Sequence, residues 1–143
     1  NLRELATSVL TMLREGSSES VPQTALEIPR ELTLSGHPAD LHILLANLLR
    51  NAFAAAGPAG SVRLYAQEDR EAVRIVVEDD GPGIPEEIHG SLFEPFISGR
   101  PEGTGIGLAL CKTVVEKRGG VIRTERPKGG PTRFLVNIPR EER

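Results

Sequence analysis

The chain has 143 residues, a formal net charge of −3, one cysteine, four phenylalanines, one tyrosine and no tryptophan. This length is enough for one domain with a hydrophobic core, and the composition excludes an internal disulfide, argues against a nucleic-acid partner and includes no apolar run that could span a membrane. We expect a cytoplasmic domain, and the start at Asn1 rather than Met indicates a piece of a longer protein.

The N-terminal half of the chain predicts two helices with short extended runs between them. Apolar residues at helical spacing predict a first helix over residues 2–15, and β-like runs follow at 24–29 and 32–36. A stronger helix is expected over 37–56, where a proline stands near the start. The apolar stripe of the first helix is Leu2, Leu5, Val9, Met12 and Leu13, and that of the second is Leu41, Leu44, Leu45, Leu48, Leu49 and Ala52.

The C-terminal half predicts strands around one further helix. Residues 61–67 and 72–79 predict a hairpin, and 86–90 carry a weak helical pattern. A helix over 105–120 and strands at 121–126 and 132–139 are expected next. Because strands and helices do not alternate regularly, we expect an α/β (α+β) sandwich in which helices cover a mixed β-sheet.

Two asparagines on the stronger helix form the first candidate site. Asn47 and Asn51 are four residues apart, so they lie one above the other beside the apolar stripe. Asparagine is a poor helix former, and its amide oxygen suits Mg²⁺, which also takes substrate phosphates as ligands. The same spacing is consistent with two exposed asparagines that have no function.

The stretch VVEDDGPGIP (76–85) ends a predicted strand with two aspartates and a glycine-rich turn. Asp79 at the strand end can accept a hydrogen bond from an exocyclic amine such as that of adenine. The glycines would let a flat ring lie against the backbone. An ordinary strand followed by an Asp-Gly turn is the alternative.

The stretch GTGIGLAL (103–110) places three alternating glycines before a predicted helix. Helix N-termini offer backbone N–H groups and a positive dipole end to phosphate. The pattern differs from a dinucleotide-binding fingerprint, since Leu108 stands where the third glycine is needed, and no Gly-Lys-Ser/Thr of a P-loop follows. A flexible loop entering a helix is the alternative.

In this order, the motifs resemble those of the ATP-binding catalytic domain of sensor histidine kinases, in the superfamily that includes type II topoisomerases, mismatch-repair ATPases and certain heat-shock chaperones. NLLRNA (47–52) resembles the N box, DDGPGIP (79–85) the G1 box, LFEPF (92–96) the F box and GTGIGLAL (103–110) the G2 box. The resemblance implies a Bergerat-type ATP-binding fold with helices packed on one face of the sheet. It also implies a single catalytic domain over 1–143, without the upstream dimerisation and phosphoacceptor domain.

The resemblance implies ATP and Mg²⁺ as cofactors and a role for each matching residue. Asn51 would bind Mg²⁺, Asn47 would support the metal–phosphate site, and Asp79 would hold the adenine amino group. Arg100 would contact the γ-phosphate, with Asn47 as the other catalytic residue. The residues expected to bind the cofactor are Asn47, Asn51, Asp79, Gly81, Gly83, Ile84, Gly103, Thr104, Gly105, Ile106, Gly107, Leu108 and Thr132.

The segment from about 84 to 102 would then cover the nucleotide, anchored by burial of Phe93 and Phe96. Many family members carry a lysine or histidine where this chain has Ala54, so phosphate charge would be neutralised by Arg50 or Arg100. His37 replaces an aspartate that is common before this helix, and we interpret it as a helix-start variant.

The resemblance also favours phosphoryl transfer over hydrolysis. The related ATPases carry a water-activating glutamate where this chain has Asn47, and an amide cannot take a proton. None of the chain's histidines, His37, His42 and His89, lies in an acceptor motif. The expected partners are ATP, the upstream histidine phosphotransfer domain of the same protein and, indirectly, a response regulator, with a monomeric isolated domain and a homodimeric whole protein.

Two other functions fit these motifs. One is a nucleotide-binding regulatory module that switches a partner without phosphorylating it. The other is a serine kinase that acts on an anti-sigma-antagonist protein and shares the same boxes. An upstream helical hairpin with an acceptor histidine would distinguish the histidine kinase from both.

Overall fold

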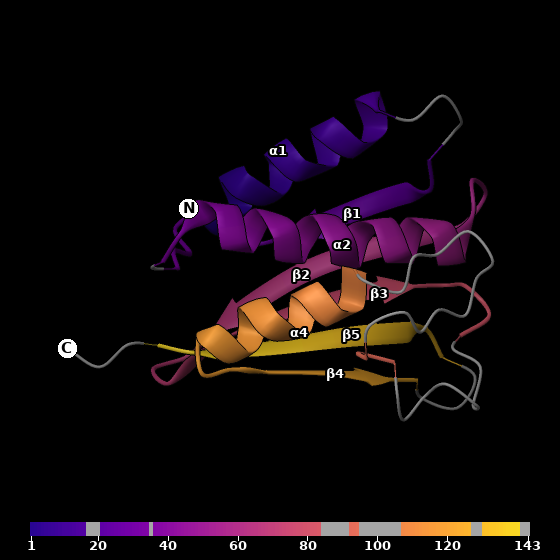
Figure 1. The fold of residues 1–143 in the computed structure, drawn as a ribbon. Coiled ribbons are helices and arrows are strands. Elements are labelled where there is room, and N and C mark those ends of the chain that lie inside the picture. The colour runs from indigo at the N-terminus through magenta and orange to yellow at the C-terminus, as the bar shows by residue number, and fades with distance from the viewer. Residues whose placement is uncertain (17–20, 35, 84–91, 95–106, 127–129, 141–143) are drawn as a thin grey trace.

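The computed structural model describes residues 1–16, 21–34, 36–83, 92–94, 107–126 and 130–140. Figure 1 shows two layers, a β-sheet and the helices of the described residues, which lie together on one of its faces. This arrangement confirms the predicted sandwich of helices on a sheet. The elements are α1 (Leu2–Glu15), β1 (Gln23–Glu27), α2 (Pro38–Ala56), β2 (Ser61–Glu68), β3 (Ala72–Asp79), α4 (Gly107–Lys117), β4 (Val121–Glu125) and β5 (Thr132–Pro139).

The sheet is mixed, with strand order β1-β2-β3-β5-β4. β1 pairs in parallel with β2, and the other neighbours are antiparallel. A parallel pair needs a crossover, and α2 supplies it between β1 and β2. The β2–β3 hairpin closes on Asp69, whose Oδ1 accepts from the backbone N–H groups of Glu71 and Ala72 at 2.8 and 2.9 Å. Hydrogen bonds from Ala72 and then Glu71 lower the pKa of the Asp69 carboxyl.

The core lies between the helices and the inner face of the sheet. All six residues of the predicted apolar stripe of α2 are buried, and the inner side chains of β2, β3 and β5 are buried against them. Cys111 of α4 lies at the contact with α2, with its Sγ 3.7 Å from the carbonyl oxygen of Leu44. Burial raises the pKa of the Cys111 thiol to about 12, so it stays a protonated, inert packing group.

One predicted strand is wrong. Among the described residues of this stretch, 32–34 and 36 form no strand, although Leu32 is completely buried. The backbone of Leu32 bonds to Pro29 at 3.2 Å and to Leu2 at 3.1 Å, so its side chain enters the core from a turn under α1. Met12, expected on the apolar stripe of α1, is 37% exposed. The predicted helical segment 86–90 lies outside the described residues.

Candidate functional site

Asp79, the last residue of β3, lies beside Thr132, the first residue of β5. They are register partners, and their exposed fractions are 1% and 3%. Partners of this kind place their Cβ atoms about 5 Å apart on one side of the sheet. The Oγ1 atom of Thr132 is buried without a hydrogen-bond partner in the part of the chain that the structure describes. An unsatisfied buried hydroxyl costs free energy, so a ligand with a polar edge would bind favourably here.

The neighbouring aspartates have different surroundings. Asp79 points inward, and its Oδ1 accepts from the backbone N–H of Gly81 at 2.9 Å. Asp80 is exposed, and its two carboxylate oxygens accept from the backbone N–H and the hydroxyl of Ser61 at 3.0 and 3.2 Å. Asp80 therefore fastens the end of β3 to the start of β2, and Asp79 is the carboxylate that faces the interior.

Gly81 lies where no side chain fits. A Cβ atom on Gly81 would collide with the backbone carbonyl of Ala55 in the last turn of α2. The turn over residues 79–83 in the G1 box, which we call the G1 turn, can therefore pack directly on the end of the helix that carries both asparagines. This packing is the function that the geometry gives to Gly81, and its predicted contact with the cofactor stays a prediction.

The side chain of Arg126 stabilises the G1 turn through hydrogen bonds to backbone carbonyl oxygens. Its Nη1 donates to the carbonyl oxygen of Pro82, and its Nε donates to that of Gly130 at 3.4 Å. Gly83 has a φ of 89°, a conformation that favours glycine, and a Cβ atom there would collide with the Arg126 guanidinium. No motif in the sequence pointed to Arg126. Its contact with Pro82 spans 44 positions, and no local pattern predicts such a pair.

The helices α2 and α4 meet at Asn47 and Gly107. Nδ2 of Asn47 donates to the carbonyl oxygen of Ile43 at 2.8 Å, so its Oδ1 is directed away from that bond. A Cβ atom on Gly107 would lie 2.8 Å from this Oδ1, which places the amide oxygen at the first residue of α4. The N box and the start of the helix in the G2 box are therefore adjacent, as the resemblance implies.

The comparisons with known proteins agree with this geometry. Residues 36–142 match the family described as "Histidine kinase-, DNA gyrase B-, and HSP90-like ATPase". The chain is 32% identical over 151 residues to the sensory histidine kinase/phosphatase NtrB of Escherichia coli O157:H7, and the match covers 97% of this chain and 43% of NtrB. It is 32% identical over 140 residues to the C4-dicarboxylate transport sensor protein DctB of Rhizobium meliloti, with 96% and 22% covered.

Two solved structures share the fold over almost the whole chain. The catalytic domain of the histidine kinase ThkA aligns with a TM-score of 0.86 and 30% identity, covering 98% of this chain and 95% of that one. The mycobacterial sensor histidine kinase MprB aligns with a TM-score of 0.81 and 27% identity, covering 97% and 96%. The chain belongs to the histidine kinase-, DNA gyrase B- and HSP90-like ATPase family. Within it, the chain is an ATP-binding domain of the sensor histidine kinase type, and it spans less than half of NtrB and DctB.

Several residues that the family resemblance points to lie near this site. Asn51 is partly buried one turn after Asn47, and Leu108 packs against the core at the start of α4. Phe93 is partly buried, with its ring perpendicular to that of Phe134 at 6.2 Å, and its role as an anchor of the segment from 84 to 102 stays a prediction. The predicted residues outside the described ranges are Ile84, Phe96, Arg100, Gly103, Thr104, Gly105 and Ile106.

The described residues fit an adenine nucleotide. The unsatisfied Thr132 hydroxyl and the buried Asp79 carboxylate offer a donor and an acceptor to a ring edge. The described residues include no group of three or more His, Cys, Asp or Glu that could hold a metal ion. A family member that binds Mg²⁺ through amide and phosphate oxygens needs no such group, and the amide of Asn51, the expected ligand, has the right chemistry. No helix in the described part of the chain is both long and apolar enough to cross a membrane.

Proposed function

We propose that this chain binds Mg-ATP and transfers the γ-phosphoryl group to a histidine on a separate dimerisation domain. The observation that best supports the proposal is the unsatisfied Oγ1 of Thr132 beside the buried Asp79 carboxylate. In the proposed complex, the adenine base of ATP would lie against Asp79 and Thr132. The phosphates would then extend toward the contact between α2 and α4.

The base would be read by complementary hydrogen bonds. Adenine presents an amino group to an acceptor, and guanine presents a carbonyl oxygen at the same ring position. The Asp79 carboxylate would accept from the adenine amine and would repel the guanine oxygen. The Thr132 hydroxyl would bond to a ring nitrogen, directly or through water. These contacts would select ATP over GTP.

The phosphates would be bound at the start of α4. The helix begins at Gly107, where backbone N–H groups and the helix dipole favour an anion. Asn51 would hold Mg²⁺, with Asn47 supporting the site. The ion would supply positive charge that neutralises the phosphates during transfer. The predicted contact of Arg100 with the γ-phosphate belongs to the same proposal.

The amide of Asn47 favours transfer over hydrolysis. Its Nδ2 is a hydrogen-bond donor to Ile43, and neither amide atom can act as a base toward water. A nucleophile that needs no deprotonation by this chain would react instead. A neutral imidazole nitrogen would bond to the γ-phosphorus as the bond from that phosphorus to the ADP oxygen breaks.

The proposal places this chain within a larger signalling protein. We propose that residues 1–143 act as one cytoplasmic catalytic domain, monomeric when isolated, in a homodimeric kinase. The acceptor histidine would lie on an upstream dimerisation domain of the same protein. A response regulator would receive the phosphoryl group from that histidine.

A phosphorylation assay tests the proposal. The chain is incubated with labelled Mg-ATP alone, and then with the adjoining upstream segment of its own protein added in trans or fused. We expect acid-labile phosphohistidine on that segment and very slow hydrolysis by the chain alone. Stable label on His37, His42 or His89 that is lost on mutating that residue would overturn the proposal. Binding of ATP without transfer to any upstream segment would favour the regulatory module, and phosphoserine on an added substrate would favour the serine kinase.

A further inference from the structure

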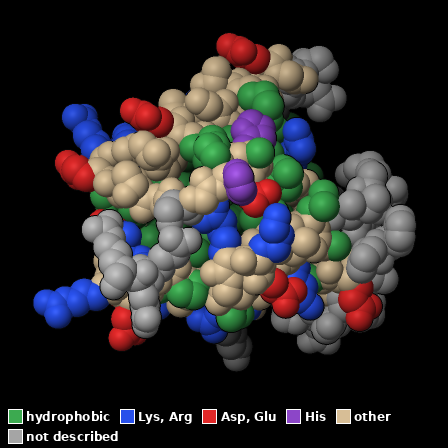
Figure 2. Space-filling view, turned by 60° about the vertical axis from the view of Figure 1, so that its left-hand side comes forward, with side chains coloured by type: hydrophobic (Ala, Val, Ile, Leu, Met, Phe, Trp, Pro, Cys, Tyr) green, Lys and Arg blue, Asp and Glu red, His purple; other side chains and the backbone are tan. Residues whose placement is uncertain are grey.

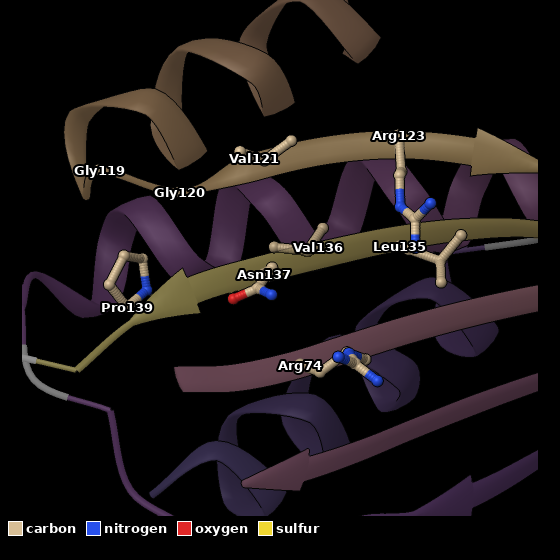
Figure 3. A pocket seen from close by; sticks show the side chains of 9 residues that line it. All are labelled: Arg74, Gly119, Gly120, Val121, Arg123, Leu135, Val136, Asn137 and Pro139. Carbon is tan, nitrogen blue, oxygen red and sulfur yellow. The ribbon is translucent and has the colours of Figure 1, made fainter. Parts of the chain in front are cut away.

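The outer face of the sheet, which the helices leave uncovered, has two halves with different charge patterns. Alternate residues of each strand point to this face, and register pairing brings them into rows across the sheet. One half is an ion-pair ladder, and the other is a shallow hollow on β3, β4 and β5. Figure 3 shows the residues that line this hollow.

Every charge of the ladder is paired with a neighbour of opposite sign. It runs across all five strands through Glu27, Arg63, Glu78, Arg133 and Glu125. Successive charges alternate in sign, and the closest pair with a normal length joins Arg133 Nε to Glu78 Oε1 at 2.7 Å. This hydrogen bond to Glu78 is the main reason that the pKa of Arg133 is raised. A row with alternating signs offers little net attraction to a charged partner.

The hollow has two arginines on an apolar floor. Its volume is about 420 Å³, and we call it the basic hollow, defined by Arg74, Val121, Arg123, Leu135 and Asn137. Val121 is 63% exposed, the largest exposure among the described large apolar side chains, and Leu135 lies beside it, partly buried. Figure 3 shows Arg123 on β4 and Arg74 on β3, with β5 between them. The apolar surface is therefore bordered by a cation on either side.

These arginines have no ion-pair partner in the described ranges of the chain, in contrast to those of the ladder. Asp69, whose pKa is lowered mainly by backbone hydrogen bonds, also feels the charge of Arg74 without forming an ion pair with it. Arg74 and Arg123 are exposed on a chain whose formal net charge is −3. Two unpaired cations on an anionic domain form a local site for negative charge.

The spacing of the arginines suits an extended peptide. Arg74 pairs with Asn137, and Arg123 pairs with Leu135, so the two arginines are two strands apart and offset by two residues. Strand geometry then puts their Cα atoms about 12 Å apart. In an extended segment, residues i and i+4 point to the same side and lie about 13 Å apart, with residue i+2 between them.

We propose that the basic hollow docks an acidic segment of a partner protein. The segment would place two carboxylates on the arginines and an apolar side chain between them on Val121 and Leu135. A second copy of this chain is a poor occupant, because its identical face would bring arginines against arginines. A flat anionic membrane is also a poor one, because it would meet the exposed carboxylates of the ladder on the same face.

Docking there would leave the nucleotide site accessible. The basic hollow lies on the outer face, whereas Asp79 and Thr132 point to the inner face under the helices. A partner could bind at the hollow while ATP is bound or exchanged. The inference therefore does not depend on the proposed catalytic function.

Titration with a peptide probe tests the inference. The probe is the blocked pentapeptide Glu-Thr-Leu-Thr-Glu, followed by backbone amide shifts in ¹H–¹⁵N spectra, and Gln-Thr-Leu-Thr-Gln is its uncharged control. We expect saturable shifts confined to β3, β4 and β5, and at least tenfold weaker binding of the uncharged peptide. Arg74→Ala with Arg123→Ala should weaken binding of the charged probe at least tenfold and leave ATP affinity unchanged.

A matched variant removes the same charge from elsewhere. Arg30→Ala with Lys112→Ala takes two exposed cations from the β1–α2 connection and from α4, and probe binding should be unchanged. Absence of saturable shifts, equal binding of both peptides or unchanged binding by the Arg74/Arg123 variant would each overturn the inference. Arginine-dependent binding to phosphatidylserine vesicles without peptide binding would overturn the protein-segment assignment.

Discussion

The proposed nucleotide site has a base end and a phosphate end, and different parts of the molecule would form them. The base end, Asp79 and Thr132, belongs to two paired strands, and both side chains are almost completely buried. The phosphate end, Asn47 and Gly107, lies where two helices meet, and both residues are partly exposed.

The side chains of the two ends are therefore held in position in different ways. Strand pairing fixes the base end without a ligand, so binding there needs little ordering of the protein. At the phosphate end, the described residues supply only part of the expected ligand shell. The remaining ligands would be the phosphates themselves and the predicted residues of the G2 box. A substitution at one end should change a property that a substitution at the other end leaves unchanged.

The largest effect on affinity is expected from Asp79→Ala, which breaks the base end. A hydrogen bond to a charged group contributes about 1.5–3 kcal/mol, and each 1.4 kcal/mol is about tenfold in affinity. ATP affinity should fall tenfold or more, and the preference for ATP over GTP should disappear. Fluorescent-nucleotide titrations with competing ATP and GTP measure both.

The stability of this variant must be checked separately, because Asp79 also accepts a hydrogen bond from the backbone N–H of Gly81. Thermal unfolding without nucleotide would show whether the substitution disturbs the domain. Asp79→Asn keeps the volume and offers a donor as well as an acceptor, so it should bind GTP better than Asp79→Ala does. A strong preference for ATP in a folded Asp79→Ala variant would remove Asp79 from the base end.

The phosphate end is tested by Asn51→Ala. The substitution should abolish the Mg²⁺-dependent part of ATP binding and leave the choice of base unchanged. The fold should persist because Asn51 is only partly buried at the edge of the core. Nucleotide titrations with Mg²⁺ and with EDTA give the measurement. Unchanged Mg²⁺ dependence would exclude Asn51 as a ligand.

A smaller effect is expected from Arg126→Ala, which loosens the base end without touching its polar groups. Arg126 bonds to the backbone of Pro82 and Gly130, so it positions the turn that follows Asp79. ATP affinity should fall several-fold, with Mg²⁺ dependence unchanged. Arg126→Lys should recover part of the loss.

The matched control for this variant is Arg123→Ala. Arg123 lies on β4, three residues before Arg126, and has no hydrogen bond to the described part of the G1 turn. Its ATP affinity should equal that of the unaltered chain. Equal affinities for Arg126→Ala and Arg123→Ala would show that the bonds to Pro82 and Gly130 do not support the base end.

The contrast between the two ends also explains what could be predicted from the sequence. Alternation along 61–79 predicted the hairpin, and the stripe on α2 predicted its buried face, because local spacing determines which residues point inward. The same alternation made residues 32–36 look like a strand. Leu32 is buried by contacts with α1 and not by a strand ladder, and such contacts depend on residues far away in the chain.

Residue roles were harder to predict than elements. Two adjacent aspartates look alike in DDGPGIP, and only the pairing of β2 with β3 decides that Asp80 meets Ser61 while Asp79 turns inward. Gly81 was predicted as a ligand contact, and its tight packing on Ala55 depends on a helix that ends 25 positions earlier. Long-range packing of this kind leaves no periodic signal in the sequence.

The smallest effect on binding is expected from Asp80→Ala. Asp80 is the neighbour of Asp79, whose substitution is expected to have the largest effect. Asp80 holds Ser61 through two hydrogen bonds at the exposed end of the β2–β3 pair. Their loss should lower the free energy of unfolding by about 1 kcal/mol, the usual net value for such bonds. ATP affinity and base preference should stay within twofold of the unaltered chain, because the carboxylate that faces the interior is retained. Chemical denaturation and nucleotide titration measure the two quantities separately. If Asp80→Ala weakened ATP as strongly as Asp79→Ala, the base end would depend on the position of the whole strand end and not on one carboxylate.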